Sequence, residues 1–371
     1  MSAAAAGDRP FLVVHDKEEG HHLVYDLLLL LLLEDGGEED TMLLVVPRPV
    51  ARFPSEWCLS FAVSGGSIVA AEYDWNSTAC FYDAVMKAGG YELWERKLRT
   101  DLRDSHGRPL RRWPMGRGYK VSRLLGGSHQ DTPAMLPLAD GTVLRMDTVL
   151  FDGFYIFDRL LPGDGGVWHA TALPNPPVTL AEDEITFISA YYALGTRVWI
   201  SVSSKMVDKG TFSMDTAEQD GGGTWQKEGD WVMPFEGRAI YVPELGKVIG
   251  LTTEARLLCA CDVNDDGTLP VLVHHVWTDD NPKPRDWPYL PWEHKSKTLP
   301  IVRHVWPDTF PRPCELEGFC ISSSSEAKPR DMPSLAYLGK GRICICRPMS
   351  TMKPHILAPP YYLHCRILPG G

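Results

Sequence analysis

Short apolar runs separated by glycine-containing turns recur along this 371-residue chain. Residues 188–234 contain an apolar run, a turn at Gly195, a β-rich run and a third apolar run that closes on Asp215. The same order follows at once, with Gly246 at the turn and Asp262 at the close. A repeat of roughly 50 residues built from short strands is typical of propeller blades. The pattern therefore predicts a repeated all-β fold.

Three further copies share parts of this pattern and occupy residues 59–98, 137–174 and 332–368. Glycine permits the positive φ of a tight hairpin, and aspartate can accept hydrogen bonds from turn amides. Tryptophan on an outer strand can pack between neighbouring blades. We assign these structural roles to Gly66, Asp83, Trp94, Gly141, Asp158, Trp168, Gly195, Asp215, Trp225, Gly246, Asp262 and Gly339.

Five copies and the N-terminal strand segments together predict a six-bladed β-propeller. Each blade would have four antiparallel strands, and pairing between the N- and C-terminal strands would close the ring, because closure removes exposed sheet edges. We expect disorder in residues 1–10 and a single propeller domain in residues 11–368, with insertions at about 96–133 and 281–331. The high contents of glycine (33 residues) and proline (30 residues) agree with many tight turns.

The strand ends FYDA, YIFDR and FSMDT, each followed by a tryptophan about ten residues later, resemble those of kelch-like β-propellers. The segments GTFSMDT, GDWVMPFEGRAIYVPELGKVIGL and SLAYLGKGRICICR are similar to those of a large group of kelch-like proteins of cereal plants. The resemblance covers roughly residues 60–347 and implies a propeller that binds other proteins. Only Gly65 and Gly66 form the kelch double glycine, and residues 1–56 contain no amphipathic helical stretch of F-box length. The resemblance therefore does not imply membership of a ubiquitin ligase.

The first insertion carries a concentration of positive charge. Residues 96–123 contain ten Lys or Arg and two Asp, a net charge of +8, whereas the whole chain carries −11. Arginines next to tryptophan could bind an acidic or phosphate-rich partner through bidentate and stacking contacts. The alternative is a solvated loop that the protein's own acidic surface neutralises. The candidate partner-binding residues here are Arg108, Arg111, Arg112 and Trp113.

The second insertion is rich in proline and aromatic residues between positions 281 and 314. Tryptophan and tyrosine are favoured at the hot spots of protein interfaces, and binding residues often lie on loops held by a rigid scaffold. Alternatively, these side chains pack the insertion onto its own blade. The candidate partner-binding residues are Trp287, Tyr289, Trp292 and Trp306.

The cysteine pairs Cys259/Cys261 and Cys344/Cys346 each place two thiols on one face of a strand. A zinc site would need all four thiols to converge tetrahedrally, and the spacing differs from that of a C-x-x-C knuckle. We therefore expect no metal site. The chain also lacks a G-x-S-x-G nucleophile elbow, a phosphate-binding P-loop and an H-E-x-x-H zinc motif. We assign no catalytic residue and no cofactor.

The cysteine count, the net charge and the absence of targeting patterns predict an intracellular protein. Nine cysteines without framework spacing suggest reduced thiols, and the charge of −11 disfavours extensive binding to nucleic acid or anionic lipid. The N-terminus does not read as a signal peptide, and the apolar run at residues 27–33 is far shorter than the ~20 residues of a membrane span. We expect a soluble monomer in the cytoplasm or nucleus.

These observations predict a non-catalytic protein-interaction module whose insertions bind a partner protein at one propeller face. A propeller hydrolase or lyase with a site in the central channel is the first alternative. It would show converging acidic, His or Tyr side chains with perturbed pKa values, whereas a binding module would show an exposed aromatic and arginine patch. A second alternative is the substrate receptor of a ubiquitin ligase that lacks its own F-box.

Overall fold

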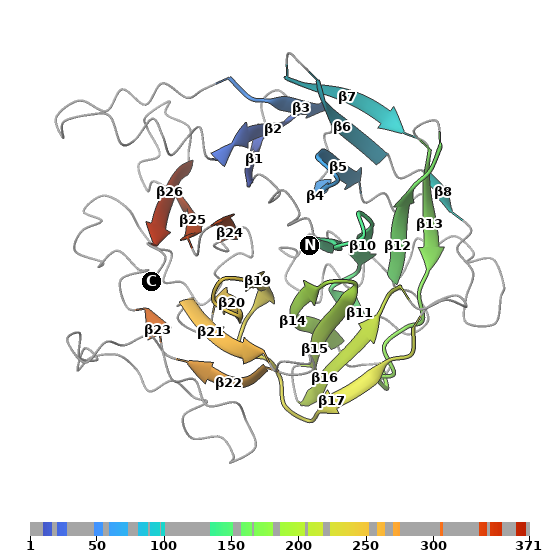
Figure 1. Ribbon diagram of the computed structural model, residues 1–371, viewed down its shortest axis with the longest axis vertical. Coiled ribbons are helices and arrows are strands. Elements are labelled where there is room, and N and C mark those ends of the chain that lie inside the picture. The colour runs from blue at the N-terminus through green and yellow to red at the C-terminus, as the bar shows by residue number, and fades with distance from the viewer. Residues whose placement is uncertain are drawn as a thin grey trace.

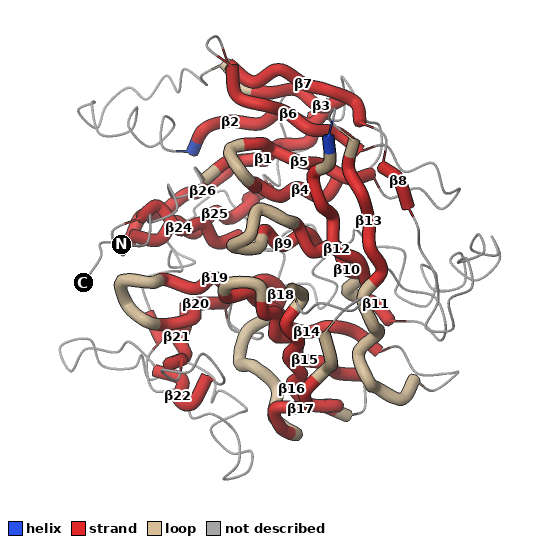
Figure 2. The backbone as a smooth tube through the Cα atoms, turned by 45° about the vertical axis from the view of Figure 1, so that its right-hand side comes forward, coloured by secondary structure: helices blue, strands red, loops and turns tan. Residues whose placement is uncertain are grey.

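The computed structural model is an all-β protein. It describes residues 10–16, 21–27, 48–54, 59–72, 81–87, 90–96, 98–100, 134–150, 157–164, 167–180, 186–204, 207–217, 223–251, 258–263, 270–274, 305–306, 334–339, 342–350 and 361–368. Within these ranges, helical conformation is confined to Leu27 and Asp164 (Figure 2). Residues 1–9 of the expected disordered segment and most of both predicted insertions lie outside the described part.

The described strands form six sheets that lie around a common centre (Figure 1). Four antiparallel strands form the body of each of the four middle sheets. The first two of these contain β4 (Leu59–Ser64), β5 (Ser67–Glu72), β6 (Phe81–Lys87) and β7 (Gly90–Arg96), then β9 (Ala134–Pro137), β10 (Val143–Met146), β12 (Phe157–Pro162) and β13 (Trp168–Ala172). The next two contain β14 (Thr186–Leu194), β15 (Arg197–Ser204), β16 (Asp208–Asp215) and β17 (Gln226–Gly229), then β19 (Ile240–Val242), β20 (Lys247–Leu251), β21 (Leu258–Val263) and β22 (Pro270–His274).

The first and last sheets have three described strands each. They are formed by β1 (Phe11–Asp16), β2 (His21–Asp26) and β3 (Ala51–Pro54), and by β24 (Ser334–Gly339), β25 (Arg342–Ser350) and β26 (Tyr361–Leu368). In the described ladders β1 pairs with β2 and β26 pairs with β25. The predicted pairing between the N- and C-terminal strands is not among those ladders, so the two terminal sheets are separate hydrogen-bonded units there.

Four short strands extend the middle sheets. Strand β8 (Leu98–Thr100) pairs in parallel with β13, and β23 (Val305–Trp306) pairs with β21. Strands β11 (Val149–Leu150) and β18 (Gly237–Arg238) both pair with β14. Each of these strands belongs to a connection between the main strands, so several connections are held to the sheets by backbone hydrogen bonds.

Glycine forms the inner hairpin turn of each middle sheet. The φ angles are 80° at Gly66, 80° at Gly141, 65° at Gly195 and 60° at Gly246. A β-carbon disfavours this left-handed conformation, which explains why glycine marks these turns in the sequence. The fifth predicted turn residue, Gly339, is the last residue of β24.

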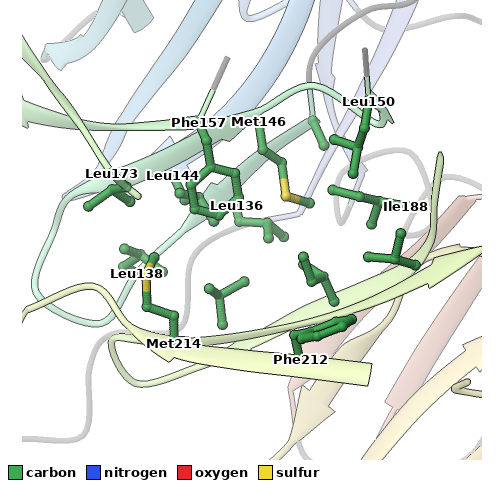
Figure 3. Packing of buried hydrophobic residues seen from close by; sticks show 14 residues of the cluster. Leu136, Leu138, Leu144, Met146, Leu150, Phe157, Leu173, Ile188, Phe212 and Met214 are labelled. Atoms are coloured by element: carbon green, nitrogen blue, oxygen red, sulfur yellow. The ribbon is translucent and has the colours of Figure 1, made fainter. Parts of the chain in front are cut away.

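The hydrophobic core lies between neighbouring sheets. Alternation along β15 directs Val198, Ile200 and Val202 toward the sheet that contains β9 and β10, where they join a buried cluster (Figure 3). The cluster includes Leu136, Leu138, Leu144, Met146, Leu150, Phe157, Leu173, Ile188, Phe212 and Met214. Full burial of one such aliphatic or aromatic side chain contributes about 1.5–3 kcal/mol, so this packing holds adjacent sheets together.

Candidate functional site

Two of the tryptophans assigned to the repeat lie between sheets, whereas a third faces solvent. Trp168 is buried and packs with Ala62 and other residues of the preceding sheet. Trp225 lies just before β17, and the centroid of its ring is 5.3 Å from that of Phe157. Its Nε1 donates a hydrogen bond of 2.8 Å to the backbone carbonyl of Pro174. Trp94 on β7 is 42% exposed. Similar spacing in the sequence therefore does not place these tryptophans in the same environment.

The repeated aspartates also occupy different positions in their strands. Asp215 ends β16 and accepts hydrogen bonds from the Ala217 amide (3.0 Å) and the Thr196 hydroxyl (2.8 Å), which is the expected turn role. Asp83 and Asp158 differ from the expectation, because β6 and β12 continue beyond them. The physical reason is register, since a constant spacing along the chain does not fix the pairing when loop lengths differ between sheets. Asp262 lies one residue before the end of β21, and its Cα partner lies in β20.

The predicted partner-binding residues of the insertions fall almost entirely outside the described residues. These are Arg108, Arg111, Arg112, Trp113, Trp287, Tyr289 and Trp292. The eighth, Trp306, lies in β23 opposite Leu258 of β21. At the start of the first insertion, Leu98 and Thr100 of β8 lie opposite Trp168 and Ala170 of β13. Each insertion thus contributes one short strand to a sheet.

Both insertions occur at the same type of connection. The first runs from the outermost main strand β7 to the innermost strand β9 of the next sheet, and the second runs from β22 to β24. Because neighbouring strands are antiparallel, successive connections alternate between the two ends of a sheet. We call the end with the inner turns at residues 64–67, 138–142, 194–197 and 243–246 the hairpin end. The connections between sheets start from the opposite end, which we call the insertion end.

Hydrogen bonds join the turns of the hairpin end across sheets. The Ser64 hydroxyl donates to the Gly141 carbonyl at 2.7 Å, and the Ala139 amide donates to the Gly195 carbonyl at 3.0 Å. Between the next two sheets along the chain, the Tyr337 hydroxyl of β24 donates to the carboxylate of Glu244. These turns are therefore committed to contacts between the sheets.

A polar face covers the side of the β14–β17 sheet opposite the apolar cluster. The Arg197 guanidinium donates to the Ser213 hydroxyl (2.8 Å) and to the Gln226 side-chain carbonyl (2.9 Å), and lies 3.5 Å from the Glu228 carboxylate. Glu228 also accepts a hydrogen bond of 2.5 Å from Ser213. This network ties the outer strand β17 to β15 and β16. Its charges are already paired within the sheet.

Aromatic rings continue the same face toward the centre. The rings of Tyr192 and Trp199 stack with centroids 4.8 Å apart, and the Arg197 guanidinium lies 5.6 Å from the Trp199 centroid. Burial, together with the neighbouring Cys261 and Glu228, raises the pKa of Tyr192 far above its ordinary value. The Tyr192 hydroxyl therefore remains protonated and cannot act as a phenolate base near neutral pH.

The cysteine pair of β21 faces the stacked rings. Cys259 and Cys261 are buried in the cluster that contains Tyr192 and Trp199, whereas Ala260 on the opposite face packs with Ile343 of β25. The two thiols thus point away from the strand that carries the other predicted cysteine pair. In the part of the chain that the structure describes, no three His, Cys, Asp or Glu side chains are grouped to hold a metal ion.

No helix in the described ranges is long and apolar enough to cross a membrane.

A search of curated proteins finds no match to the sequence. Among solved structures, dihydro-heme d1 dehydrogenase NirN in complex with DHE is 13% identical, with a TM-score of 0.37 over 91% of this chain and 48% of that chain. A protein from Lactobacillus plantarum is 12% identical, with a TM-score of 0.38 over 70% of this chain and 65% of that chain. The chain thus spans less than two thirds of either protein.

A family described as "Protein of unknown function (DUF1668)" matches residues 128–359. The match covers more than half of the 371 residues and includes the described strands from β9 to β25. The protein therefore belongs to the DUF1668 family.

Proposed function

We propose that this protein is a non-catalytic protein-interaction module, built as a six-bladed, kelch-like β-propeller whose two insertions bind a partner at the insertion end. The observation that carries the proposal is the common placement of the insertions. Both occupy connections between sheets, and both are joined to a sheet by a short strand, β8 or β23. Rigid scaffolds that present long loops in this way commonly use the loops for binding.

Strand anchoring favours recognition by the insertions. Three residues of β8 are held in register against β13, and two residues of β23 are held against β21. The anchor of the first insertion follows directly after β7, whereas that of the second lies within the insertion. Anchoring of this kind reduces the conformational entropy that a loop loses when it binds, and so increases affinity.

The composition of the insertions indicates the kind of partner. The first has a net charge of +8, and the second contains tryptophan and tyrosine among prolines. Arginine pairs with carboxylate or phosphate groups, and tryptophan and tyrosine fill apolar pockets at interface hot spots. The proposed partner is a protein surface with an acidic region next to an apolar one.

Affinity purification followed by mass spectrometry tests the proposal. The insertion variant carries R111A, R112A, W113A, W287A and W292A, and the control variant carries R48A, K227A and W94A, which remove charge and aromatic area outside the insertions. The proposal predicts that defined partners are captured by the natural chain and by the control, and are lost from the insertion variant. Far-UV circular dichroism and thermal unfolding establish that both variants are folded. Capture of the same partners by the folded insertion variant would contradict the proposal.

A further inference from the structure

Two cysteines lie directly opposite each other in the last sheet. Strand β25 runs antiparallel to β26, and Cys346 of β25 is the Cα partner of Cys365 of β26. The ladder between these strands continues on both sides of the pair without a register shift. Strand β26 is the outermost strand of this sheet in the described order, whereas β24 lies nearest the common centre (Figure 1). The backbone therefore brings the two cysteines together in the outer part of the sheet.

The geometry of an antiparallel ladder suits a disulfide at this pair. Directly opposite residues have Cα atoms about 4.5 Å apart in a non-hydrogen-bonded pair and about 5.5 Å apart in a hydrogen-bonded pair. Disulfides join residues whose Cα atoms are about 4.4–6.8 Å apart. Both kinds of pair fall within this range, and opposite residues also share one face of the sheet. A bond between Cys346 and Cys365 therefore needs no change of register.

Register distinguishes this pair from the other cysteines of the described strands. Cys344 shares a face of β25 with Cys346, but its Cα partner is an isoleucine. Cys365 is only its diagonal neighbour, and diagonal neighbours lie about 7–8 Å apart, beyond the distance that a disulfide spans without backbone movement. In the described ladders of β21, Cys259 and Cys261 have no cysteine among their Cα partners.

We propose that Cys346 and Cys365 are a redox-sensitive pair that forms a disulfide when a peroxide oxidises the protein. One thiolate attacks the O–O bond of hydrogen peroxide, which gives a sulfenic acid and one molecule of water. The second thiolate attacks the sulfenic sulfur, so that the S–S bond forms and a second water leaves. The two thiols together lose two electrons and two protons, and the peroxide is reduced to two molecules of water. A dithiol reductant reverses the reaction by thiol–disulfide exchange.

The bond would fasten the outermost strand covalently to its sheet. In the described ladders β26 pairs with β25 alone. The disulfide would close a loop over residues 347–364, and it would keep β26 from separating from β25. In a reducing compartment such bonds are transient and act as redox sensors, so the reduced thiols predicted from the cysteine spacing are the resting state of the pair. The inference does not depend on the proposed function, and either can fail without the other.

Disulfide mapping of the natural chain tests the pair directly. The reduced protein is treated with hydrogen peroxide, the peroxide is removed with catalase, and the remaining thiols are blocked with N-ethylmaleimide in urea. Chymotrypsin then cleaves after Tyr361 and Tyr362, which places the two cysteines in different peptides for mass spectrometry without reduction. We expect linked peptides that join Cys346 to Cys365 and that dithiothreitol separates. The proposal is overturned if Cys365 remains a thiol or joins another cysteine.

Serine variants test whether register determines the pairing. C344S keeps the opposed pair and should form the link at the rate of the natural chain. C346S leaves only the diagonal Cys344 near Cys365, so its disulfide should form at least about tenfold more slowly. Equal rates for the two variants would overturn the assignment to the opposed pair, and so would a tenfold difference that persists when the chain is oxidised in urea. The mapping of the natural chain needs no variant, so it remains decisive if a variant does not fold.

Discussion

The guanidinium of Arg145 and the carboxylate of Asp158 form a buried, two-pronged ion pair within one sheet. The Nε–Oδ1 distance is 3.0 Å and the Nη2–Oδ2 distance is 2.6 Å. The residues are Cα partners on β10 and β12, and their side chains are 4% and 0% exposed. Both charges have been removed from water, so each depends on the other for compensation.

Removal of one partner should therefore be more harmful than removal of both. We expect R145M or D158L to lower the free energy of unfolding by about 3–5 kcal/mol, because each leaves an uncompensated buried charge. The R145M/D158L double variant should regain most of that loss. Urea unfolding of the four proteins measures the coupling between the residues. Single variants within about 0.5 kcal/mol of the natural chain would show that the pair does not stabilise the fold.

Substitution of the repeat tryptophans should give graded effects. W168A removes a buried ring from between two sheets and should cost about 3–5 kcal/mol. W94A removes a ring that is 42% exposed and should cost less than W168A by at least about 1 kcal/mol. Urea unfolding of both variants makes the comparison, with W94A as the matched control. Equal losses would contradict the packing difference.

Local chemistry made part of the fold predictable. The glycines at positions 66, 141, 195 and 246 could be placed in turns because only a residue without a β-carbon adopts positive φ readily. The repeat copy predicted at residues 332–368 contains the strands β24, β25 and β26. Both signals depend on a few neighbouring residues.

Features that depend on distant segments could not be read from the sequence. Asp158 and Asp215 follow their turn glycines at similar intervals, yet one forms a buried ion pair and the other closes a strand. The parallel pairing of β8 with β13 and of β18 with β14 joins segments that carry no complementary local signal.

The buried hydroxyl of Thr211 should stabilise the segment that leads to β18. In T211V the Trp231 carbonyl and the Ser201 hydroxyl lose a buried hydrogen-bond partner, which should cost about 1–3 kcal/mol. The control is T171V, because Thr171 is an exposed residue of β13 and should tolerate the change. Thermal or urea unfolding provides the measurement. A loss no larger for T211V than for T171V would contradict the role assigned to this network.

Cys259 should be inert in the folded protein. Burial raises the pKa of its thiol well above the ordinary value, so the reactive thiolate is scarce at mildly alkaline pH. We expect iodoacetamide at about pH 8 to leave Cys259 unmodified until the protein is unfolded in urea. Peptide mass spectrometry before and after unfolding gives the result. Rapid labelling in the native state would show that β21 is accessible.

Asp140 should make the stability of the hairpin end sensitive to acid. Burial raises its pKa, but hydrogen bonds from Thr142 and the charge of Arg159 lower it more, so the folded value lies below 3.8. Its stabilising contribution is therefore present above the unfolded pKa and is lost as the pH falls through the folded value. The natural chain should be more stable than D140N at neutral pH, and the difference should shrink below about pH 4. Urea unfolding across pH, with D164N as the control, tests this; a difference that grows on acidification would contradict it.

Cross-linking of the protein to its captured partner tests the central claim most directly. The sequence has lysines in the first insertion at positions 97 and 120 and in the second at 283, 295, 297 and 328, and the scaffold lysines include those at 209, 227 and 247. We predict that the intermolecular cross-links of a lysine-reactive reagent, mapped by mass spectrometry, fall on lysines of the insertions. Cross-links concentrated on Lys247 at the hairpin end, with none from either insertion, would contradict the account.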